Sequence, residues 1–219
     1  MTVSVATLQA FLESNNFVSK GSQESIDAAI ELAGVIRSGN NGGQRKTYNV
    51  HDYLKRLSVE EVNTELDKTR SGMVNVFVNL LGDFNLASAI RLSNWHNVNS
   101  VWIVGRRRWD RRGAVGTHHY TPINYARAYE ECFDSLRTEG YRIVAAEITD
   151  DATPLNTYEW TDKSAVIYGE EGAGLSEEIL AAVDDVVYIP GRGSVRSLNV
   201  ATTAGIFTYD YHSKLGLFE

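Results

Sequence analysis

Five arginines lie within seven residues near the middle of the chain. They are Arg106, Arg107, Arg108, Arg111 and Arg112. Like charges this close repel one another, which predicts a solvated loop. Guanidinium groups bind phosphates with two hydrogen bonds and stack on bases, and Trp109 lies within the cluster. The segment therefore predicts a surface that binds RNA, although an exposed loop without a specific partner would have the same pattern.

Two glycine-containing segments later in the chain are suited to holding a flat ligand. The first reads Tyr168-Gly169-Glu170-Glu171-Gly172-Ala173-Gly174-Leu175, and the second runs from Ile189-Pro190-Gly191-Arg192-Gly193-Ser194 to Ser197-Leu198-Asn199. Glycine lets backbone amides and carbonyls approach a ligand closely. Each segment alone would also fit an ordinary turn between a strand and a helix.

Several other residues that can do chemistry favour structural or surface roles. His118 and His119 are adjacent, and no Cys or carboxylate stands at ligand spacing from them, so we expect no metal site there. The single cysteine, Cys132, lies on a predicted helix and is predicted to be buried in the protein core. Trp95 and Trp102 are predicted to be packing residues.

Short apolar strands alternate with helices in the part of the chain that must position these segments. Predicted strands cover residues 74–80, 100–105, 141–148, 164–169 and 186–190, and predicted helices cover 85–97, 125–139, 176–183 and 198–214. This alternation predicts an α/β fold with a parallel sheet of about five strands. Ligands of such sheets bind beyond the carboxyl ends of the strands. A conventional dinucleotide site is disfavoured, because residues 81–85 after the first strand contain one glycine.

The first 72 residues have a different, polar and helical pattern. Apolar residues at helical spacing predict a helix over 22–37, and a glycine- and asparagine-rich segment, 38–43, follows it. Ser58 and Glu61 have the spacing of a capping box and predict a helix that continues to about residue 70. We therefore predict two domains: a helical extension over 1–72 that could bind RNA, and an α/β domain over 73–219.

The net charge of −7 at first disfavours a polyanion partner, but the charge is unevenly distributed. Residues 76–127 carry a net charge of +5, whereas residues 128–219 carry −11. RNA is therefore expected to bind at one part of the surface. The sequence has no apolar run long enough to span a membrane and no signal-peptide pattern, and one cysteine suits a reducing compartment. These features predict a cytoplasmic protein.

Three segments, in this order, resemble the three motifs of the SpoU (TrmH-type) RNA 2′-O-ribose methyltransferases of the SPOUT superfamily. The first is Asn85-Leu86-Ala87-Ser88-Ala89-Ile90-Arg91, the second is Tyr168 to Ser176, and the third is Ile189-Pro190 with Ser197-Leu198-Asn199-Val200. The chain departs from the family where Pro often precedes the first-motif Asn, where Gly often takes the place of Ala87, and where Met often takes the place of Gly191.

The resemblance implies a C-terminal trefoil knot, a homodimer, and a tRNA or rRNA substrate. It also implies S-adenosylmethionine as the methyl donor, with S-adenosylhomocysteine as the product and no metal. The cofactor-binding residues that it implies are Gly169, Glu170, Gly172, Ile189, Ser197 and Leu198, and the catalytic residues are Arg91, Asn85, Glu171, Ser197 and Asn199.

The residue that matches Arg91 is held in this family to activate the ribose 2′-hydroxyl. A guanidinium has a pKa above ~12, so Arg91 acts either as a base in a strongly perturbed site or as a group that positions the ribose phosphate. Two other functions stay open from sequence alone. One is a knotted RNA-binding protein that has lost catalysis, and the other is a SPOUT enzyme that methylates a base.

Overall fold

The computed structural model describes residues 50–78, 83–105, 108–170 and 172–218. The chain divides into two compact units, Met1–Lys55 and Arg56–Glu219. The described part of the first unit contains one 3-10 turn, Asp52–Leu54. The predicted helix over 22–37 and the segment 38–43 lie outside the described residues.

The second unit contains a sheet of seven strands within the described residues, all of them parallel. The strands are β1 (Met73–Val78), β2 (Ser100–Val104), β3 (Ile123–Ala126), β4 (Arg142–Ala146), β5 (Thr153–Pro154), β6 (Ser164–Tyr168) and β7 (Asp185–Tyr188). Their order across the sheet is β3-β2-β1-β6-β4-β7-β5. The parallel α/β prediction is confirmed, and its five strands are all present.

The predicted strand count was too low because β3 and β5 were not expected, and the predicted helix over 125–139 therefore began too early. Tyr125 and Ala126, predicted to begin a helix, instead pair with Ile103 and Val104 of β2. β3 is a half-buried edge strand and β5 has two residues, so neither carries the long apolar run typical of a central strand. The helix that follows β3 begins at Tyr129.

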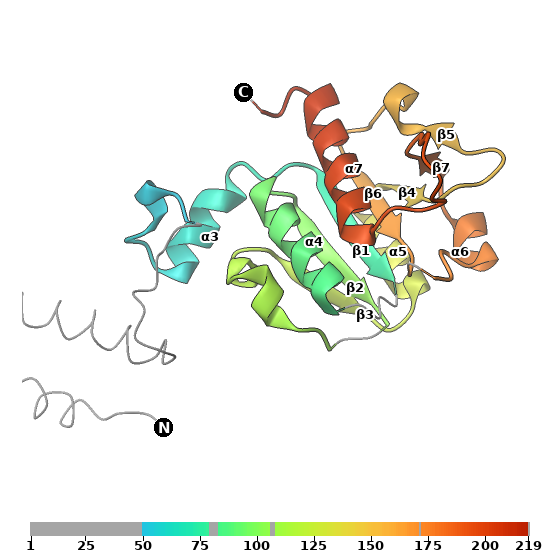
Figure 1. Ribbon diagram of the computed structural model, residues 1–219. Coiled ribbons are helices and arrows are strands. Elements are labelled where there is room, and N and C mark those ends of the chain that lie inside the picture. The colour runs from blue at the N-terminus through green and yellow to red at the C-terminus, as the bar shows by residue number, and fades with distance from the viewer. Residues whose placement is uncertain (1–49, 79–82, 106–107, 171, 219) are drawn as a thin grey trace, which may run out of the picture. The chain divides into compact units, whose positions relative to one another are not determined.

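Helices cover both faces of the sheet and make it a three-layer structure (Figure 1). One face packs against α4 (Asp83–Trp95) and α7 (Val200–Lys214), which lie side by side, and the other packs against α5 (Tyr129–Thr138) and α6 (Glu177–Ala182). Each face of the sheet has its own hydrophobic core, and alternate residues of a strand point into one core or the other. In β1, Met73 and Phe77 face α4 and α7, while Val74 and Val76 face α5 and α6. Burial on both faces explains why β1 is apolar at nearly every position.

The capping box at Ser58 is confirmed. The Ser58 amide donates to Glu61 Oε2 at 2.7 Å, and the Glu61 amide donates to Ser58 Oγ at 3.2 Å. The helix that this box begins, α3, spans Val59–Asp67 and belongs to the second compact unit. The predicted domain boundary at residue 72 stays a prediction.

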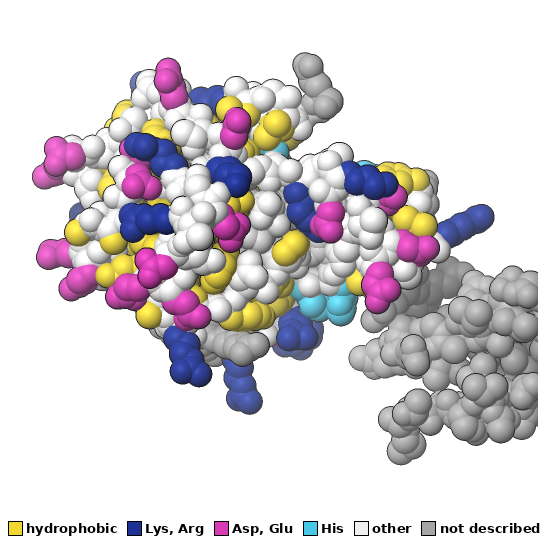
Figure 2. All heavy atoms as spheres, turned by 180° about the vertical axis from the view of Figure 1, so that it is seen from behind, with side chains coloured by type: hydrophobic (Ala, Val, Ile, Leu, Met, Phe, Trp, Pro, Cys, Tyr) yellow, Lys and Arg dark blue, Asp and Glu magenta, His cyan; other side chains and the backbone are white. Residues whose placement is uncertain are grey.

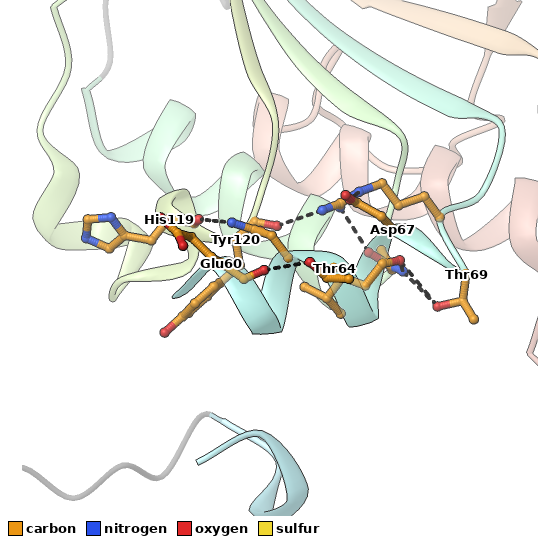
Figure 3. Close-up of polar contacts among 10 residues, drawn as sticks. Glu60, Thr64, Asp67, Thr69, His119 and Tyr120 are labelled. Atoms are coloured by element: carbon orange, nitrogen blue, oxygen red, sulfur yellow. Dashed lines mark hydrogen bonds and ion pairs between the residues drawn. The ribbon is translucent and has the colours of Figure 1, made fainter. Parts of the chain in front are cut away.

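Two side chains from α3 and its C-terminal end attach it to loops of the α/β body (Figure 3). Asn63 Nδ2 donates to the carbonyl of His119 at 3.1 Å. Arg70, whose side chain is 8% exposed, donates to the carbonyl of Tyr120 at 3.3 Å and to Asn97 Oδ1 at 3.1 Å. α3 is thereby fixed beside the 3-10 turn Thr117–His119.

A buried polar network joins four elements of the sheet and its α4–α7 layer. Asn75 of β1 donates to Ser93 Oγ of α4 at 3.0 Å and to Thr208 Oγ1 of α7 at 3.3 Å. The hydroxyl of Tyr168 of β6 donates to Asn75 Oδ1 at 3.2 Å. All four residues are buried, so the network fixes how α4 and α7 lie on the strands.

The remaining predictions on single residues have mixed outcomes. Cys132 is buried in α5, as predicted, and burial raises the pKa of its thiol to about 12. Trp102 packs against the α5–α6 core, whereas Trp95 at the end of α4 is 79% exposed, so its predicted packing role within the chain is wrong. No helix in the described part of the chain is long and apolar enough to cross a membrane.

Candidate functional site

The carboxyl edge of the sheet brings together the segments that were singled out in the sequence. All the strands are parallel, so the chain leaves every strand at this edge. α4 follows β1, the glycine loop 169–175 follows β6, and the segment 189–199 follows β7. β4 lies between β6 and β7, so the chain after β4 leaves the sheet between the two predicted cofactor loops.

Asn85 and Asn199 connect the first and third of these segments. Asn199 Nδ2 donates to Asn85 Oδ1 at 2.8 Å, although the two residues are 114 positions apart. Asn199 is also the N-cap of α7, because its Oδ1 accepts from the amides of Ala201 at 3.0 Å and Thr202 at 3.3 Å. α7 therefore begins at Val200, two residues later than predicted, and its first turn is fixed to the first turn of α4.

The other predicted catalytic residues have different surroundings. Arg91 lies on α4 with an exposed side chain, and it makes no hydrogen bond or ion pair with the residues that the structure describes. Ser197 lies in the segment 190–199, in which every residue is exposed. Glu171 lies outside the described residues. The guanidinium of Arg91 is therefore accessible to an anionic group from solvent.

The glycine loop after β6 folds back on itself. The amide of Gly174 donates to the carbonyl of Glu170 at 2.8 Å, and these two residues form an antiparallel bridge. A Cβ on Gly169 would stand 2.4 Å from the carbonyl carbon of Gly174, so no larger residue fits without moving the loop. Glu147, which sequence reasoning missed, accepts from the amide of Leu175 through Oε2 at 3.1 Å. Its position directly after the observed strand β4 is the signal that could have found it.

Three glycines at this edge have no packing reason to be glycine. A Cβ on Gly172, Gly191 or Gly193 meets nothing within 4 Å among the described residues. A ligand that approaches the backbone closely would account for them. The predicted cofactor residue Leu198 and its neighbour Val195 are exposed, as is Ile148 after β4, so apolar side chains are available beside backbone donors. Such a surface fits the adenosine and methionine parts of S-adenosylmethionine.

The described part of the arginine cluster is less uniform than its sequence. Arg106 and Arg107 lie outside the described residues. Arg108 is exposed, while Arg112 donates from Nε and Nη2 to both carboxylate oxygens of Asp110. These hydrogen bonds lower the pKa of Asp110 and raise that of Arg112. Arg112 therefore already has a counter-ion.

Trp109, which lies within the arginine cluster of the sequence, is partly buried against the core. The guanidinium of Arg111 lies over the ring of Trp109 at 5.9 Å from its centroid. The rings of Trp109 and His118 are nearly perpendicular, and their centroids are 5.9 Å apart. Burial, with the nearby His119, lowers the pKa of His118, which keeps this imidazole neutral at pH 7. The exposed Arg111 and the partly buried His118 thus both pack against Trp109.

Comparisons with known proteins agree with this arrangement. The family model described as the SpoU rRNA Methylase family matches residues 72–209, more than half of the chain. The chain belongs to the SpoU rRNA methylase family.

A tRNA (guanosine(18)-2′-O)-methyltransferase of Escherichia coli K12 is 27% identical over 129 residues, which cover 58% of this chain and 56% of that protein. The chain thus spans a little over half the length of the first relatives that it matches.

Two solved structures have the same fold. The A. aeolicus TrmH/SpoU tRNA modifying enzyme matches with a TM-score of 0.65 and 20% identity, covering 73% of this chain and 84% of that one. An AdoMet-bound rRNA methyltransferase from Sinorhizobium meliloti matches with a TM-score of 0.61 and 22% identity, covering 67% of this chain and 58% of that one.

Proposed function

We propose that this SpoU-family protein transfers a methyl group from S-adenosylmethionine to a ribose 2′-hydroxyl of tRNA or rRNA and releases S-adenosylhomocysteine. The relatives support both kinds of RNA, since one is named for a tRNA guanosine and another as an rRNA methyltransferase. The observation that carries the proposal is the hydrogen bond between Asn85 and Asn199. It joins the first and third motif segments at the edge where an α/β sheet binds its ligand.

The cofactor would lie against the two glycine loops, held by the backbone of Gly169, Glu170 and Gly172 and by Ile189, Ser197 and Leu198. When bound, S-adenosylmethionine supplies a methyl group on a positively charged sulfonium. The open space at Gly172, Gly191 and Gly193 supports close contact between backbone and ligand. The rRNA methyltransferase from S. meliloti holds AdoMet in its crystal structure, which supports the choice of cofactor.

Arg91 would position the ribose phosphate, and its exposed guanidinium supports that role. Transfer forms a bond between the 2′-oxygen and the methyl carbon and breaks the sulfur–carbon bond, while the hydroxyl proton leaves to phosphate or water. Asn85 and Asn199 would orient Arg91 or the ribose by neutral hydrogen bonds. Glu171 would hold the Arg91 guanidinium, and Ser197 would connect Arg91 to the cofactor loop. Alignment of the reacting atoms is the main contribution expected from these side chains.

RNA would approach over the positive segment. Arg108, Arg111 and Arg112, with Arg106 and Arg107, would contact phosphates, and residues 1–72 would extend the contact surface. Acidic side chains gather on the side of α6, seen from behind in Figure 2, and include Glu177 and Glu178. They would repel RNA and direct it toward the arginines.

A second copy of the chain would cover an apolar surface along α7, the residues that follow it and the C-terminal end of α4. Its exposed residues are Trp95, Ile206, Tyr209, Leu217 and Phe218. The rings of Tyr209 and Phe218 lie 5.3 Å apart, so part of this surface is one aromatic cluster. Exposed apolar clusters mark interfaces. Trp95→Glu and Tyr209→Glu should convert a dimer into monomers in light scattering, and a wild-type monomer would contradict the dimer.

The family's trefoil knot is the remaining part of the proposal. It is supported by the course of the chain after β6, a strand that lies between β1 and β4 in the sheet. The next strand in the sequence, β7, lies on the other side of β4. The chain then returns to form α7, which packs on α4, β1 and β6.

The function is tested by transfer of tritiated methyl groups to total RNA, separated into tRNA and rRNA, with the wild type and with Arg91→Ala. Arg91→Ala should abolish transfer and leave S-adenosylmethionine affinity, measured by calorimetry, nearly unchanged. Digestion to nucleosides should find the label on ribose. Label on a base would assign the sister reaction, RNA binding without cofactor binding would assign a non-catalytic module, and an active Arg91→Ala would overturn the catalytic assignment.

A further inference from the structure

Glu147 occupies a fixed place at the carboxyl edge, directly after β4. Its amide donates to the carbonyl of Val187 at 3.1 Å, so the neighbouring strand β7 holds its backbone. The side chain is partly buried, and it faces the glycine loop that follows β6. Glu147 therefore links the chain after β4 to the loop after β6.

Both oxygens of the Glu147 carboxylate accept hydrogen bonds from backbone. Oε2 accepts from the amide of Leu175 at 3.1 Å, and Oε1 accepts from the amide of Ile148 at 3.0 Å. Hydrogen bonds to an ionised acceptor are roughly twice as strong as neutral ones. Leu175 is buried, so its amide lies where water competes poorly for that bond.

The shape of the loop depends on this carboxylate. Gly174 has φ +68°, and a Cβ on it would stand 2.6 Å from Glu147 Oε2. An alanine at this position would therefore push the carboxylate away from the Leu175 amide. The backbone of Gly174 also lies against Gly169, where a Cβ would be 2.4 Å away, and so the turn transmits the position of Glu147 to the start of the loop.

We propose that Glu147 is a positioning residue for cofactor binding: its carboxylate holds residues 172–175 of the glycine loop in the conformation that presents the backbone of Gly169, Glu170 and Gly172 to the cofactor. This inference rests on the proposed function. Glu147 acts through the loop and not on the ligand's charge, so it stabilises binding of S-adenosylmethionine and of S-adenosylhomocysteine alike.

The test uses the full chain with Glu147→Ala, Glu147→Gln and, as a matched control, Glu177→Gln. The control removes an exposed carboxylate two residues after Leu175. Calorimetry measures the Kd of S-adenosylmethionine and of S-adenosylhomocysteine. Glu147→Ala should weaken both by about tenfold. Glu147→Gln keeps one acceptor oxygen and should weaken both by about threefold. Glu177→Gln should change neither.

A second readout needs no ligand. Hydrogen exchange of the Leu175 amide, followed by NMR in the cofactor-free protein, should accelerate in Glu147→Ala and less in Glu147→Gln, while amides of β1 keep their protection. This separates the two proposals: a wild type that does not bind S-adenosylmethionine contradicts the proposed function, and the exchange data still test the link between Glu147 and the loop.

Three results would overturn the inference. They are unchanged Kd values in Glu147→Ala, a loss for S-adenosylmethionine alone, which would mean that the carboxylate acts on the sulfonium charge, and unchanged exchange of Leu175.

Discussion

Asn199 Nδ2 donates a hydrogen bond to Asn85 Oδ1 at 2.8 Å while Asn199 Oδ1 caps α7. One amide group thus begins the last helix and fixes the start of α4. The two functions use different atoms of the same side chain, so substitutions can separate them.

Asn199→Ala and Asn199→Ser should differ in stability but not in activity. Alanine removes the cap and should lower the free energy of unfolding by about 1 kcal/mol, whereas serine is a good N-cap and should keep most of it. Both remove the donor to Asn85, so both should reduce methyl transfer. Urea unfolding and transfer assays measure the two effects. A fully active Asn199→Ser would mean that the contact with Asn85 is not needed.

Gly169→Ala and Gly172→Ala should both weaken cofactor binding, but only Gly169→Ala should also lower stability. The added Cβ of Gly169→Ala would overlap Gly174, so we expect a loss of about 1–3 kcal/mol in stability together with weaker cofactor binding. The Cβ of Gly172→Ala meets open space, so stability should hold while S-adenosylmethionine affinity falls. Thermal unfolding and calorimetry distinguish them. Unchanged affinity in Gly172→Ala would place the cofactor elsewhere.

Much of the fold could be predicted from sequence because the central strands are buried on both faces. The residues of β1 are all buried. A run of this kind can be recognised as a strand from its own sequence, without knowledge of the strands that pair with it. β3 was missed because pairing with β2 defines it, and its residues Ile123–Ala126 are mostly half-buried. Local pattern carries little information about an edge strand.

The site was predictable only where the motifs lie. Asn85 and Asn199 were named from their resemblance to family motifs, but their hydrogen bond joins positions far apart in sequence. Glu147 carries no motif, and its role depends on the backbone of Leu175 after another strand. Trp95 was predicted to pack because it is large and apolar, yet exposure follows from which face of α4 the sheet covers.

Arg108 and Arg112 should contribute unequally to RNA binding. Both side chains are exposed, but Arg112 is already paired with Asp110, whereas Arg108 makes no ion pair with the residues that the structure describes. Arg108→Ala should therefore reduce the slope of log affinity against log salt by about one unit if it contacts a phosphate. Arg112→Ala should reduce it less. Filter binding to tRNA over a salt series measures both slopes, and equal reductions would mean that RNA displaces Asp110 from Arg112.

Asn75 should be one of the most sensitive buried positions. Asn75→Ala leaves Ser93, Thr208 and Tyr168 without their shared partner and should cost about 2–4 kcal/mol of stability. Tyr168→Phe removes one hydrogen bond and should cost about 1 kcal/mol. Urea unfolding measures both. A near-neutral Asn75→Ala would show that the network does not determine how α4 and α7 pack.

His96 and His212 should make the fold sensitive to mild acid. Burial, with the neighbouring His212, lowers the pKa of His96 to about 4, and burial also lowers the pKa of His212. The unfolded chain therefore binds protons near pH 6.5 that the folded chain does not accept. The free energy of unfolding therefore has its full value, as far as these histidines determine it, above about pH 6.5, and it decreases as the pH falls toward 4.

The melting temperature should therefore decrease between about pH 7.5 and pH 5, before most carboxylates titrate. His96→Gln should flatten this decrease, because it removes the imidazole whose pKa is lowered to about 4. His118→Gln on the arginine surface is the comparison: the pKa of His118 is also lowered by burial, but its ring lies against Trp109 and not against His212, so this variant should flatten the decrease less than His96→Gln. A wild-type melting temperature that is constant over this range would contradict the prediction. It would mean that His96 binds a proton as readily in the folded chain as in the unfolded chain, and that its ring contact with His212 opens in solution.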